Sequence, residues 1–354
     1  MKKTLSLFLS ALLLAALLMG CGTAQAPVET TAAPTETAET TVETTAATEA
    51  TEAAEAVDVR VAALKGPTAM GLAQFIHDAA ATTDNNYQFT VAVNPDEIVP
   101  QLIKGEVDMA AIPANLASVV YNKTEGGIQV LGINTLGVLY VVESGDTVHT
   151  MADLKGKTLF ATGKNHTPEQ ALTYLLEQNG MKLGQDVTVE WKSEPAECLA
   201  ALENAENGIA MLPQPFVTVA MTKNENLRVA LDLTAEWNAV QAEAENPSAM
   251  VTGVVVARKA FVEEHPQAVS AFMDHYAASV DFVNTNVEEA AAYIEEIGVV
   301  KAPIAKKAIP ACNIVFLEGA EMQGRLSGYL EVLFNQNPQS VGGALPESDF
   351  YFAR

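Results

Sequence analysis

The sequence predicts an α/β fold built as two lobes. Segments typical of buried strands alternate with segments of helical periodicity, which favours mostly parallel sheets. The alternation runs through two successive blocks of similar design. About 300 residues remain after an atypical N-terminus, more than one hydrophobic core usually holds.

The first block begins at Val57 and the second at Met151. In the first, we expect strands at 57–63, 87–93 and 107–112 and helices at 69–81, 97–104 and 115–122, followed by an apolar stretch at 129–143 that is broken at 134–137. In the second, we expect strands at 158–162, 187–191 and 209–212 and helices at 168–179, 195–204 and 216–223, and the segment 228–233 closes the block. The segment 250–257 returns to a strand. The tail predicts helices at 259–262, 268–284, 287–297, 303–308 and 318–335, with no further strand of note.

Two segments show the similarity of the blocks. Residues 102–115 read LIKGEVDMAAIPAN and residues 201–215 read ALENAENGIAMLPQP. Each predicts helix, glycine, short strand, proline, helix, and proline is well suited to a first helical turn. The pattern favours two lobes of similar build over one large sheet.

The N-terminus predicts export and lipidation. Lys2 and Lys3 precede an apolar run from Leu5 to Met19, and the run ends at Gly20 and Cys21. A charged start, a short apolar core and a small residue are typical of a secretory signal. Residues 18–21 follow the order aliphatic, variable, small, Cys, which resembles a bacterial lipobox. We therefore expect a signal at 1–20, a lipid on Cys21 and attachment to the outer face of the cell membrane; a plain secretory signal is the alternative.

Residues 22–56 are almost entirely Thr, Ala, Glu and Pro. They contain too little apolar surface to offset the entropy of ordering, so 21–56 is expected to be a tether. The chain has a net charge of −24; without the two signal lysines and the seven tether glutamates it has −19. This charge argues against nucleic acid and anionic membrane surfaces as partners.

The histidines are scattered, and no CxxC or HExxH pattern occurs in the sequence, so no metal and no cofactor are expected. Cys198 and Cys312 fall in different predicted lobes, and we expect both to be free.

Four segments resemble the bacterial solute-binding proteins of the nitrate, sulfonate and taurine type, a superfamily that includes binders of the thiamine pyrimidine precursor. They are ALKGPTAMG (63–71), LIKGEVDMAAIP (102–113), MADLKGKTLFATG (151–163) and VTGVVVARKAFVEEHPQAVSAFM (251–273). The resemblance covers nearly all of residues 57–354, in order. It implies a type II periplasmic-binding-protein-like fold, with two crossover strands and a ligand cleft between the lobes.

On this resemblance we place the crossovers near 139–143 and 247–254. Lobe one is then 57–142 with 250–354, and lobe two is 143–249. The implied function is capture of a small solute and delivery to the permease and ATPase of an ABC importer, by a protein expected to be a monomer and not an enzyme. A surface sensor or adhesin is the alternative, and an enzyme related to thiamine-pyrimidine synthase is disfavoured because its His- and Cys-containing segment is missing from the sequence.

Ligands of open α/β sheets bind at the carboxyl ends of the strands, near helix N-termini. Side chains with neutral hydrogen-bonding groups in the corresponding turns are the candidate contacts, although the threonines and Asn115 are equally suited to capping helices. Trp237, in a polar stretch predicted to be irregular, is a candidate stacking group, although core packing is the usual role of tryptophan. The predicted ligand-binding residues are Gly66, Pro67, Thr68, Ala69, Met70, Pro113, Ala114, Asn115, Asn134, Thr135, Gly163, Lys164, Asn165, His166, Thr167, Gln214, Trp237 and Thr252. These turns contain no arginine, which favours a neutral or weakly charged organic ligand.

Overall fold

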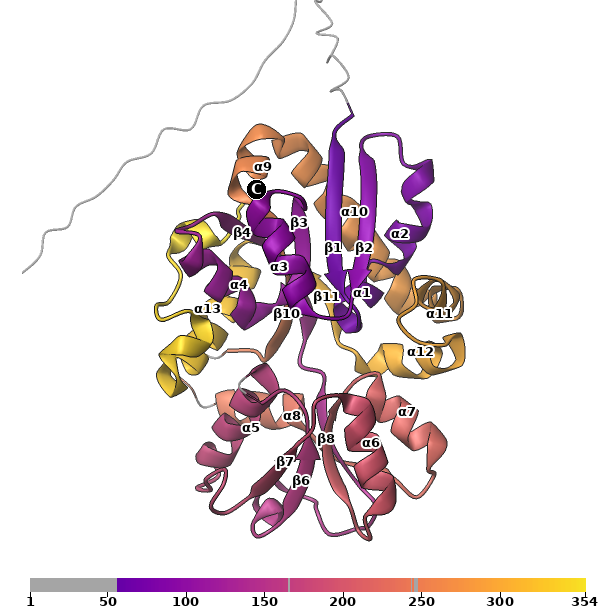
Figure 1. Ribbon diagram of the computed structural model, residues 1–354, viewed down its shortest axis with the longest axis vertical. Coiled ribbons are helices and arrows are strands. Elements are labelled where there is room, and N and C mark those ends of the chain that lie inside the picture. Colours follow the sequence, from indigo (N-terminus) through magenta and orange to yellow (C-terminus); the bar gives the residue numbers. More distant parts are fainter. Residues whose placement is uncertain (1–55, 165, 243, 245–247) are drawn as a thin grey trace, which may run out of the picture. The chain divides into compact units, whose positions relative to one another are not determined.

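The computed structural model describes residues 56–354 except 165, 243 and 245–247 (Figure 1). The predicted signal, Cys21 and all of the predicted tether but its last residue lie outside the described residues. The described residues form one compact unit.

A six-stranded sheet forms the first lobe. Its strand order is β11-β4-β10-β3-β1-β2. The strands are β1 (Asp58–Leu64), β2 (Asn86–Ala92), β3 (Met109–Pro113), β4 (Ile128–Leu136), β10 (Val251–Arg258) and β11 (Ile314–Leu317). β1 runs parallel to β2 and β3, whereas β10 runs antiparallel to both β3 and β4. The returning strand β10 is thus inserted in the middle of the sheet.

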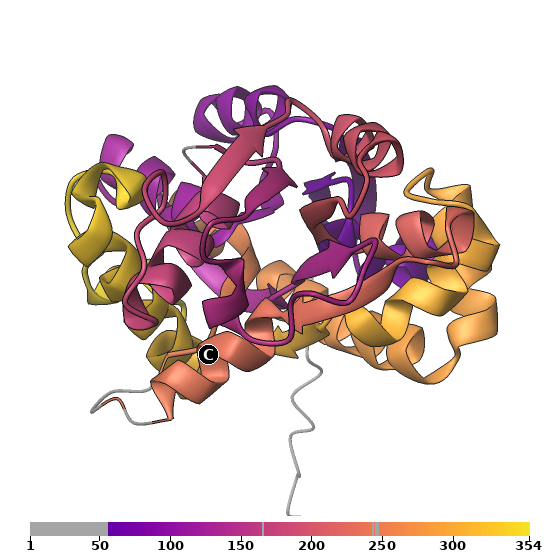
Figure 2. The ribbon, with the colours of Figure 1, turned by 90° about the horizontal axis from the view of Figure 1, so that it is seen from below.

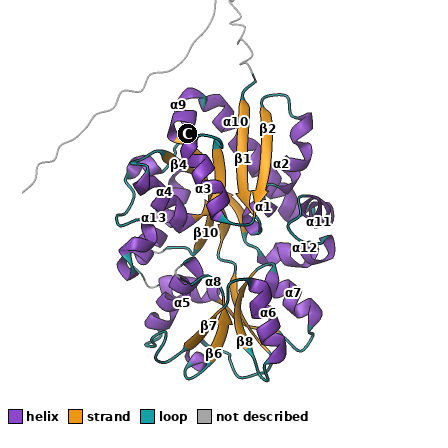
Figure 3. Cartoon of the chain, viewed as in Figure 1, coloured by secondary structure: helices purple, strands orange, loops and turns teal. Residues whose placement is uncertain are grey.

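Helices cover this sheet (Figure 3). They are α1 (Pro67–Met70), α2 (Ala73–Asp78), α3 (Pro95–Lys104), α4 (Ala114–Lys123), α9 (Lys259–Glu264), α10 (Pro266–Thr285), α11 (Val287–Glu296), α12 (Ala302–Ala308) and α13 (Gly319–Gln336). Helix α3 shows how the sequence fixes their ends. Asn94 and Glu97 form a capping box, Pro95 is the first helical residue, and Gly105 ends the helix in the left-handed conformation with φ 75°.

A five-stranded sheet of order β7-β6-β8-β5-β9 forms the second lobe. Its strands are β5 (Leu139–Glu143), β6 (Thr158–Ala161), β7 (Thr188–Trp191), β8 (Ile209–Pro213) and β9 (Arg228–Asp232). Its helices are α5 (Thr167–Gln178), α6 (Pro195–Asn204), α7 (Phe216–Lys223) and α8 (Leu233–Gln241). β6 is parallel to β7 and β8, and β5 is antiparallel to β8 and β9.

The chain passes between the sheets twice. It leaves the first sheet after β4 and, with two residues between, enters the second at β5. It returns between α8 and β10 (Figure 1). The predicted fold class, a two-lobed periplasmic-binding-protein-like α/β fold, is confirmed. The first passage falls at Gly137 and Val138, just before the segment 139–143 that the sequence suggested, because the whole of β5 pairs within the second sheet.

The lobes share part of their hydrophobic core. One buried cluster contains residues of both sheets together with α5, α8 and α13. Within it, Trp237 of α8 packs against Tyr174 of α5 and Tyr329 of α13, with ring centroids 4.6 and 5.5 Å apart. The lobes are therefore in apolar contact along these three helices.

A buried carboxylate fastens the first sheet. Asp108 is 1% exposed and accepts hydrogen bonds from Arg60 Nε and Nη2 at 2.8 and 2.7 Å and from Arg258 Nη2 at 2.7 Å. Burial opposes ionisation, but these hydrogen bonds outweigh it and lower the pKa of Asp108 below its usual value. We call these three residues the Asp108 cluster; they tie the entry to β3 to β1 and β10.

Two elements depart from the sequence prediction. The tail contains a strand, β11, and the stretch around Trp237 that was expected to be irregular is the helix α8. Asp232 caps α8 by accepting from the backbone N–H groups of Thr234 and Ala235. Cys198 and Cys312, the cysteines among the described residues, are both free and both buried.

Candidate functional site

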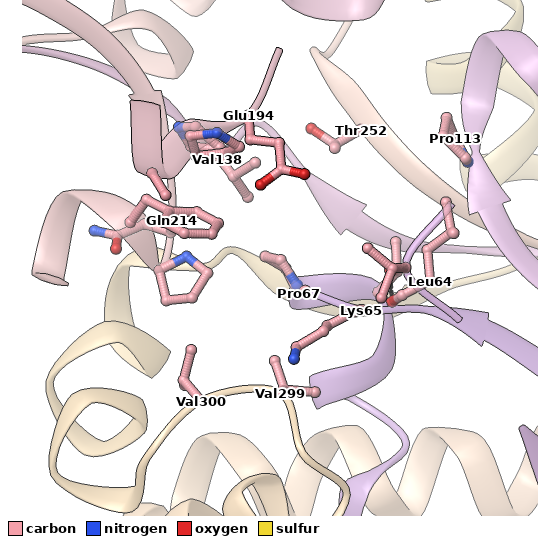
Figure 4. Close-up of a pocket in the computed structure, with 18 of the residues that line it drawn as sticks. Leu64, Lys65, Pro67, Pro113, Val138, Glu194, Gln214, Thr252, Val299 and Val300 are labelled. Carbon is pink, nitrogen blue, oxygen red and sulfur yellow. Dashed lines mark hydrogen bonds between the residues drawn. The ribbon is translucent and has the colours of Figure 1, made fainter. Parts of the chain in front are cut away.

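A pocket of about 440 Å³ lies between the two sheets (Figure 4). Its size is within the range of small-molecule sites, about 300–1,000 Å³. The first lobe contributes Leu64, Lys65, Gly66, Pro67, Thr68, Val93, Asn94, Pro113, Thr252, Val299 and Val300; the second contributes Ser193, Glu194, Pro195, Ala196, Pro213, Gln214, Pro215 and Phe216; and Val138 lies on the first connection.

Most of the wall is formed where parallel strands end and helices begin. The turns after β1, β2 and β3 lead into α1, α3 and α4, and the turns after β7 and β8 lead into α6 and α7. The first N–H groups of a helix have no partner within that helix. The pocket therefore lies at the carboxyl edges of both sheets, where backbone donors are available to a ligand. Figure 2 shows the molecule from the side of the second lobe.

Local sequence explains these turns. Pro67, Pro95 and Pro195 occupy the first turns of α1, α3 and α6, where a missing N–H costs nothing. Gly66 has φ 136° and ψ −159°, a conformation that residues with a side chain rarely adopt. Glycine at this position lets β1 turn directly into α1 at the wall of the pocket.

The wall is mainly aliphatic, with Phe216 as its aromatic member. Among the described lining residues there is no arginine, histidine or tryptophan, and two are charged. These are Lys65 and Glu194, whose side chains both reach into the pocket in Figure 4. They come from opposite lobes.

Six of the predicted ligand-binding residues line this pocket: Gly66, Pro67, Thr68, Pro113, Gln214 and Thr252. Thr68 is held firmly, since its Oγ1 donates to the Leu64 carbonyl at 2.7 Å and its own carbonyl accepts from Tyr276 Oη at 3.1 Å. Burial raises the pKa of the Tyr276 phenol, which keeps it a donor. The Gln214 amide turns back to α7, where its Oε1 accepts from the backbone and hydroxyl of Thr218.

Other predicted residues lie behind the wall. Ala69, Met70 and Ala114 are fully buried. Asn134 and Thr135 are buried in β4, where Thr135 Oγ1 donates to Asn134 Oδ1 at 3.0 Å. These five residues support the pocket without lining it.

The turn after β6 lies away from the pocket. Thr167 Oγ1 donates to Asn115 Oδ1 at 3.0 Å, so the N-termini of α5 and α4 are joined across the lobes. Asn115 Nδ2 also donates to the Ser340 carbonyl. Thr167 and Asn115, both predicted to bind ligand, are therefore hydrogen-bonded to each other and do not line the pocket.

Gly163, Lys164 and His166 are likewise absent from its described wall, and Asn165 lies outside the described residues. Trp237 is fully buried in the shared core, where its Nε1 donates to Ser248 Oγ at 3.3 Å.

Sequence reasoning missed the charged and proline-rich turns at the pocket. Lys65, Asn94, Glu194 and Phe216 all adjoin turns that follow predicted strands, so the same rule applied to every parallel strand would have found them. Val299 and Val300 follow α11 in the tail, and no local pattern marks them.

The described part of the chain contains neither a candidate metal cluster nor a candidate membrane-spanning helix. No group of three or more His, Cys, Asp or Glu side chains there is placed to hold a metal ion. No helix of the described residues is long and apolar enough to cross a membrane.

Known structures share this fold. An ABC transporter protein from Parabacteroides distasonis is 24% identical, with a TM-score of 0.71 over 84% of this chain and 99% of that one. The periplasmic aliphatic sulphonate-binding protein SsuA from Escherichia coli is 15% identical, with a TM-score of 0.66 over 84% and 92%. The alkanesulfonate-binding protein SsuA from Xanthomonas axonopodis pv. citri, bound to MOPS, is 13% identical, with a TM-score of 0.59 over 82% and 94%.

No curated protein sequence matches the chain. A protein-family model does: the NMT1/THI5-like model matches residues 94–290, which is more than half of the sequence. The matched segment contains most of the pocket turns, the whole second sheet and the returning strand β10. The chain therefore belongs to the NMT1/THI5-like family, in agreement with the resemblance seen in its sequence motifs.

Proposed function

We propose that this protein is a solute-binding lipoprotein of an ABC importer. It captures a small organic solute outside the cytoplasmic membrane and presents it to the permease. The observation that carries the proposal is the pocket between the lobes, built from strand ends of both sheets. A ligand that contacts both lobes stabilises the arrangement in which they approach each other, and that arrangement gives a permease a surface to recognise.

The N-terminal sequence supports the location. A lipid on Cys21 and an acidic, Thr-rich tether would hold the body near the membrane without burying it there. The sequence placed residues 57–142 and 250–354 in one lobe and 143–249 in the other. Because all of β5 pairs within the second sheet, we propose to move the first boundary to Gly137 and Val138. Metabolic labelling with palmitate should mark the full chain, and Cys21→Ser should abolish the label.

Ligand binding is tested with residues 21–354 carrying Cys21→Ser, which has no lipid. A thermal-shift panel contains thiamine precursors, flavins, sulfonates, nitrate, amino acids and purines. A solute that binds the folded state adds about 2.7 kcal/mol of stability at 100 times its dissociation constant.

A matched pair of variants locates the binding. Ala196 is exposed and lines the pocket at the start of α6, whereas Ala200 is exposed one turn later and does not line it. Ala196→Trp should abolish the shift and Ala200→Trp should preserve it. A folded protein that binds nothing in the panel, or a binder indifferent to Ala196→Trp, would count against the proposed function.

A further inference from the structure

The two charged side chains of the pocket are both unpaired. Lys65 stands in the turn after β1 and Glu194 directly before α6, and neither side chain forms a hydrogen bond or an ion pair with any described residue. Both extend into the pocket (Figure 4). Other exposed charges of the described residues, such as Lys104 and Glu206, are also unpaired, so what distinguishes Lys65 and Glu194 is that they face one cavity from opposite lobes.

Glu194 is not needed to start its helix. It is the N-cap residue of α6, yet its carboxylate accepts no hydrogen bond from the helix. The carboxylate that closes this turn is that of Glu197 in the first helical turn, which accepts from the backbone N–H of Ser193, the residue before the N-cap, at 2.9 Å. The nearest lysine along the chain, Lys192, is engaged elsewhere, since its Nζ lies 3.3 Å from Glu190 and 5.2 Å from the centre of the Phe160 ring.

Lys65 is equally free. Its backbone N–H donates to the Ala92 carbonyl at 2.8 Å, which fixes the turn, while its side chain projects toward Val299 and Val300 in Figure 4. The ammonium group therefore lies beside aliphatic walls that offer it no acceptor. A ligand anion would supply one.

The other lining residues indicate the size and polarity of the ligand. Leu64, Val138, Pro213, Phe216 and Val300 are apolar, and the volume of about 440 Å³ exceeds what a small inorganic anion fills. Lys65 and Glu194 are both exposed in this arrangement, so the cost arises when a ligand fills the pocket and excludes water. A purely anionic ligand would then leave the Glu194 carboxylate desolvated and unpaired next to it, which is costly. A purely cationic ligand would meet the same difficulty at Lys65.

We propose that the solute is a small amphoteric molecule: an apolar body with a cationic nitrogen held by Glu194 and an anionic group held by Lys65. This inference rests on the proposed function and specifies the charge pattern of its ligand. Each lobe then holds one end of the solute, so neither lobe alone binds it tightly. Glu194 and Lys65 become the specificity-determining residues.

The test screens residues 21–354 with Cys21→Ser against the metabolite panel and one matched set: 4-(aminomethyl)benzoate, benzylamine, benzoate and benzyl alcohol. Dissociation constants of all binders are measured by calorimetry for the parent protein, Glu194→Gln and Lys65→Met. The strongest binders should carry both charges. A hydrogen bond between charged groups contributes about 1.5–3 kcal/mol, so each variant should weaken these binders roughly 10- to 150-fold.

Charge dependence separates ligand contact from a direct bond between the two side chains. If Glu194 and Lys65 only joined the lobes to each other, their loss would weaken neutral and amphoteric ligands equally. We expect neutral ligands to change less than about threefold, within the ~0.5 kcal/mol typical of surface substitutions. Glu225→Gln removes an exposed carboxylate of the same lobe that does not line the pocket and should change nothing.

The outcomes distinguish the two proposals. Strongest binding of neutral, purely cationic or purely anionic molecules, or equal effects on all ligands, overturns the amphoteric assignment and leaves the solute-binding role intact. Failure of every molecule to bind the folded protein refutes the proposed function and this inference with it.

Discussion

Gly253 provides a quantitative test of how the pocket wall is built. It lies in β10 opposite Pro113 of β3 and Thr135 of β4, directly after the lining residue Thr252. A Cβ atom added there would stand 2.4 Å from Asn134 Oδ1 and 2.5 Å from Thr68 Cγ2. Ordinary contacts of this kind are close to 3.5–4 Å, so both neighbours would have to move by about an ångström.

Neither neighbour can move freely. Asn134 is 1% exposed, and the Thr68 side chain is fixed by its 2.7 Å hydrogen bond to the Leu64 carbonyl. Overpacking a tight site costs about 1–3 kcal/mol, so Gly253→Ala should lower the free energy of unfolding by that amount. For a chain of this size the melting temperature should fall by roughly 2–4 °C per kcal/mol. Since Thr68 lines the pocket, solute binding should weaken as well.

Urea unfolding followed by circular dichroism measures the effect. Gly324→Ala is the matched control, because Gly324 lies within α13 and a Cβ atom added to it would have no heavy atom within 4 Å outside its own helix backbone and chain neighbours. That substitution should stabilise the protein by about 0.5–1 kcal/mol through helix propensity. If Gly253→Ala unfolded at the same urea concentration as the parent or a higher one, the described packing between β10, Asn134 and Thr68 would be wrong.

Three further predictions concern other parts of the body. Asp108→Asn should lower the free energy of unfolding by about 2 kcal/mol at pH 7. This is less than the ~3–5 kcal/mol expected when one partner of a fully buried ion pair is removed, because the arginines of the Asp108 cluster are part-exposed. Because the native pKa of Asp108 is depressed, its contribution is present above its unfolded pKa of about 4 and lost as the pH falls through the native pKa, so the gap between variant and parent in urea should narrow in acid. Thr167→Val should leave Asn115 Oδ1 without its donor, cost about 1 kcal/mol, and increase the radius of gyration in small-angle scattering; an unchanged radius would show that this bond does not hold the lobes. Burial raises the pKa of the Cys198 thiol to about 11 and that of Cys312 to about 12, so neither should react with a maleimide at pH 7 until the protein unfolds, and fast labelling of the native protein would contradict their burial.

The sequence predicted most of the fold because the alternation of strand and helix is strong in both blocks. The expected helix 195–204 and the expected helix 216–223 coincide with α6 and α7. Local signals failed where elements are short or weakly marked. β11 has only four residues, with Asn313 (φ 44°) directly before it and Gly319 (φ 59°) two residues after its end. It pairs with β4 through an irregular register. Its run Ile-Val-Phe-Leu, bounded by turn residues, was the available signal.

The candidate site was predicted in part for a geometric reason. The rule that ligands lie at strand ends identified the turns after β1, β3 and β8, but it does not say which strand ends stay open. The end of β6 is covered because Thr167 bonds to Asn115 and the α5, α8 and α13 helices pack together. Contact between lobes depends on residues far apart in the sequence, so periodicity cannot reveal it. Trp237 belongs to that contact, which explains why it is core.

The location of the lining residues explains why fold and ligand can vary independently in such a molecule. Nearly all of them lie in turns within a few residues of a strand end, such as 64–68, 193–196 and 213–216, whereas the sheets behind them make the core. Replacing a turn residue changes the chemistry of the pocket at little cost to packing. A relative 24% identical can therefore share the fold while giving no information about this solute. The charges that this chain places in its own turns, on Lys65 and Glu194, are the more direct evidence of what it binds.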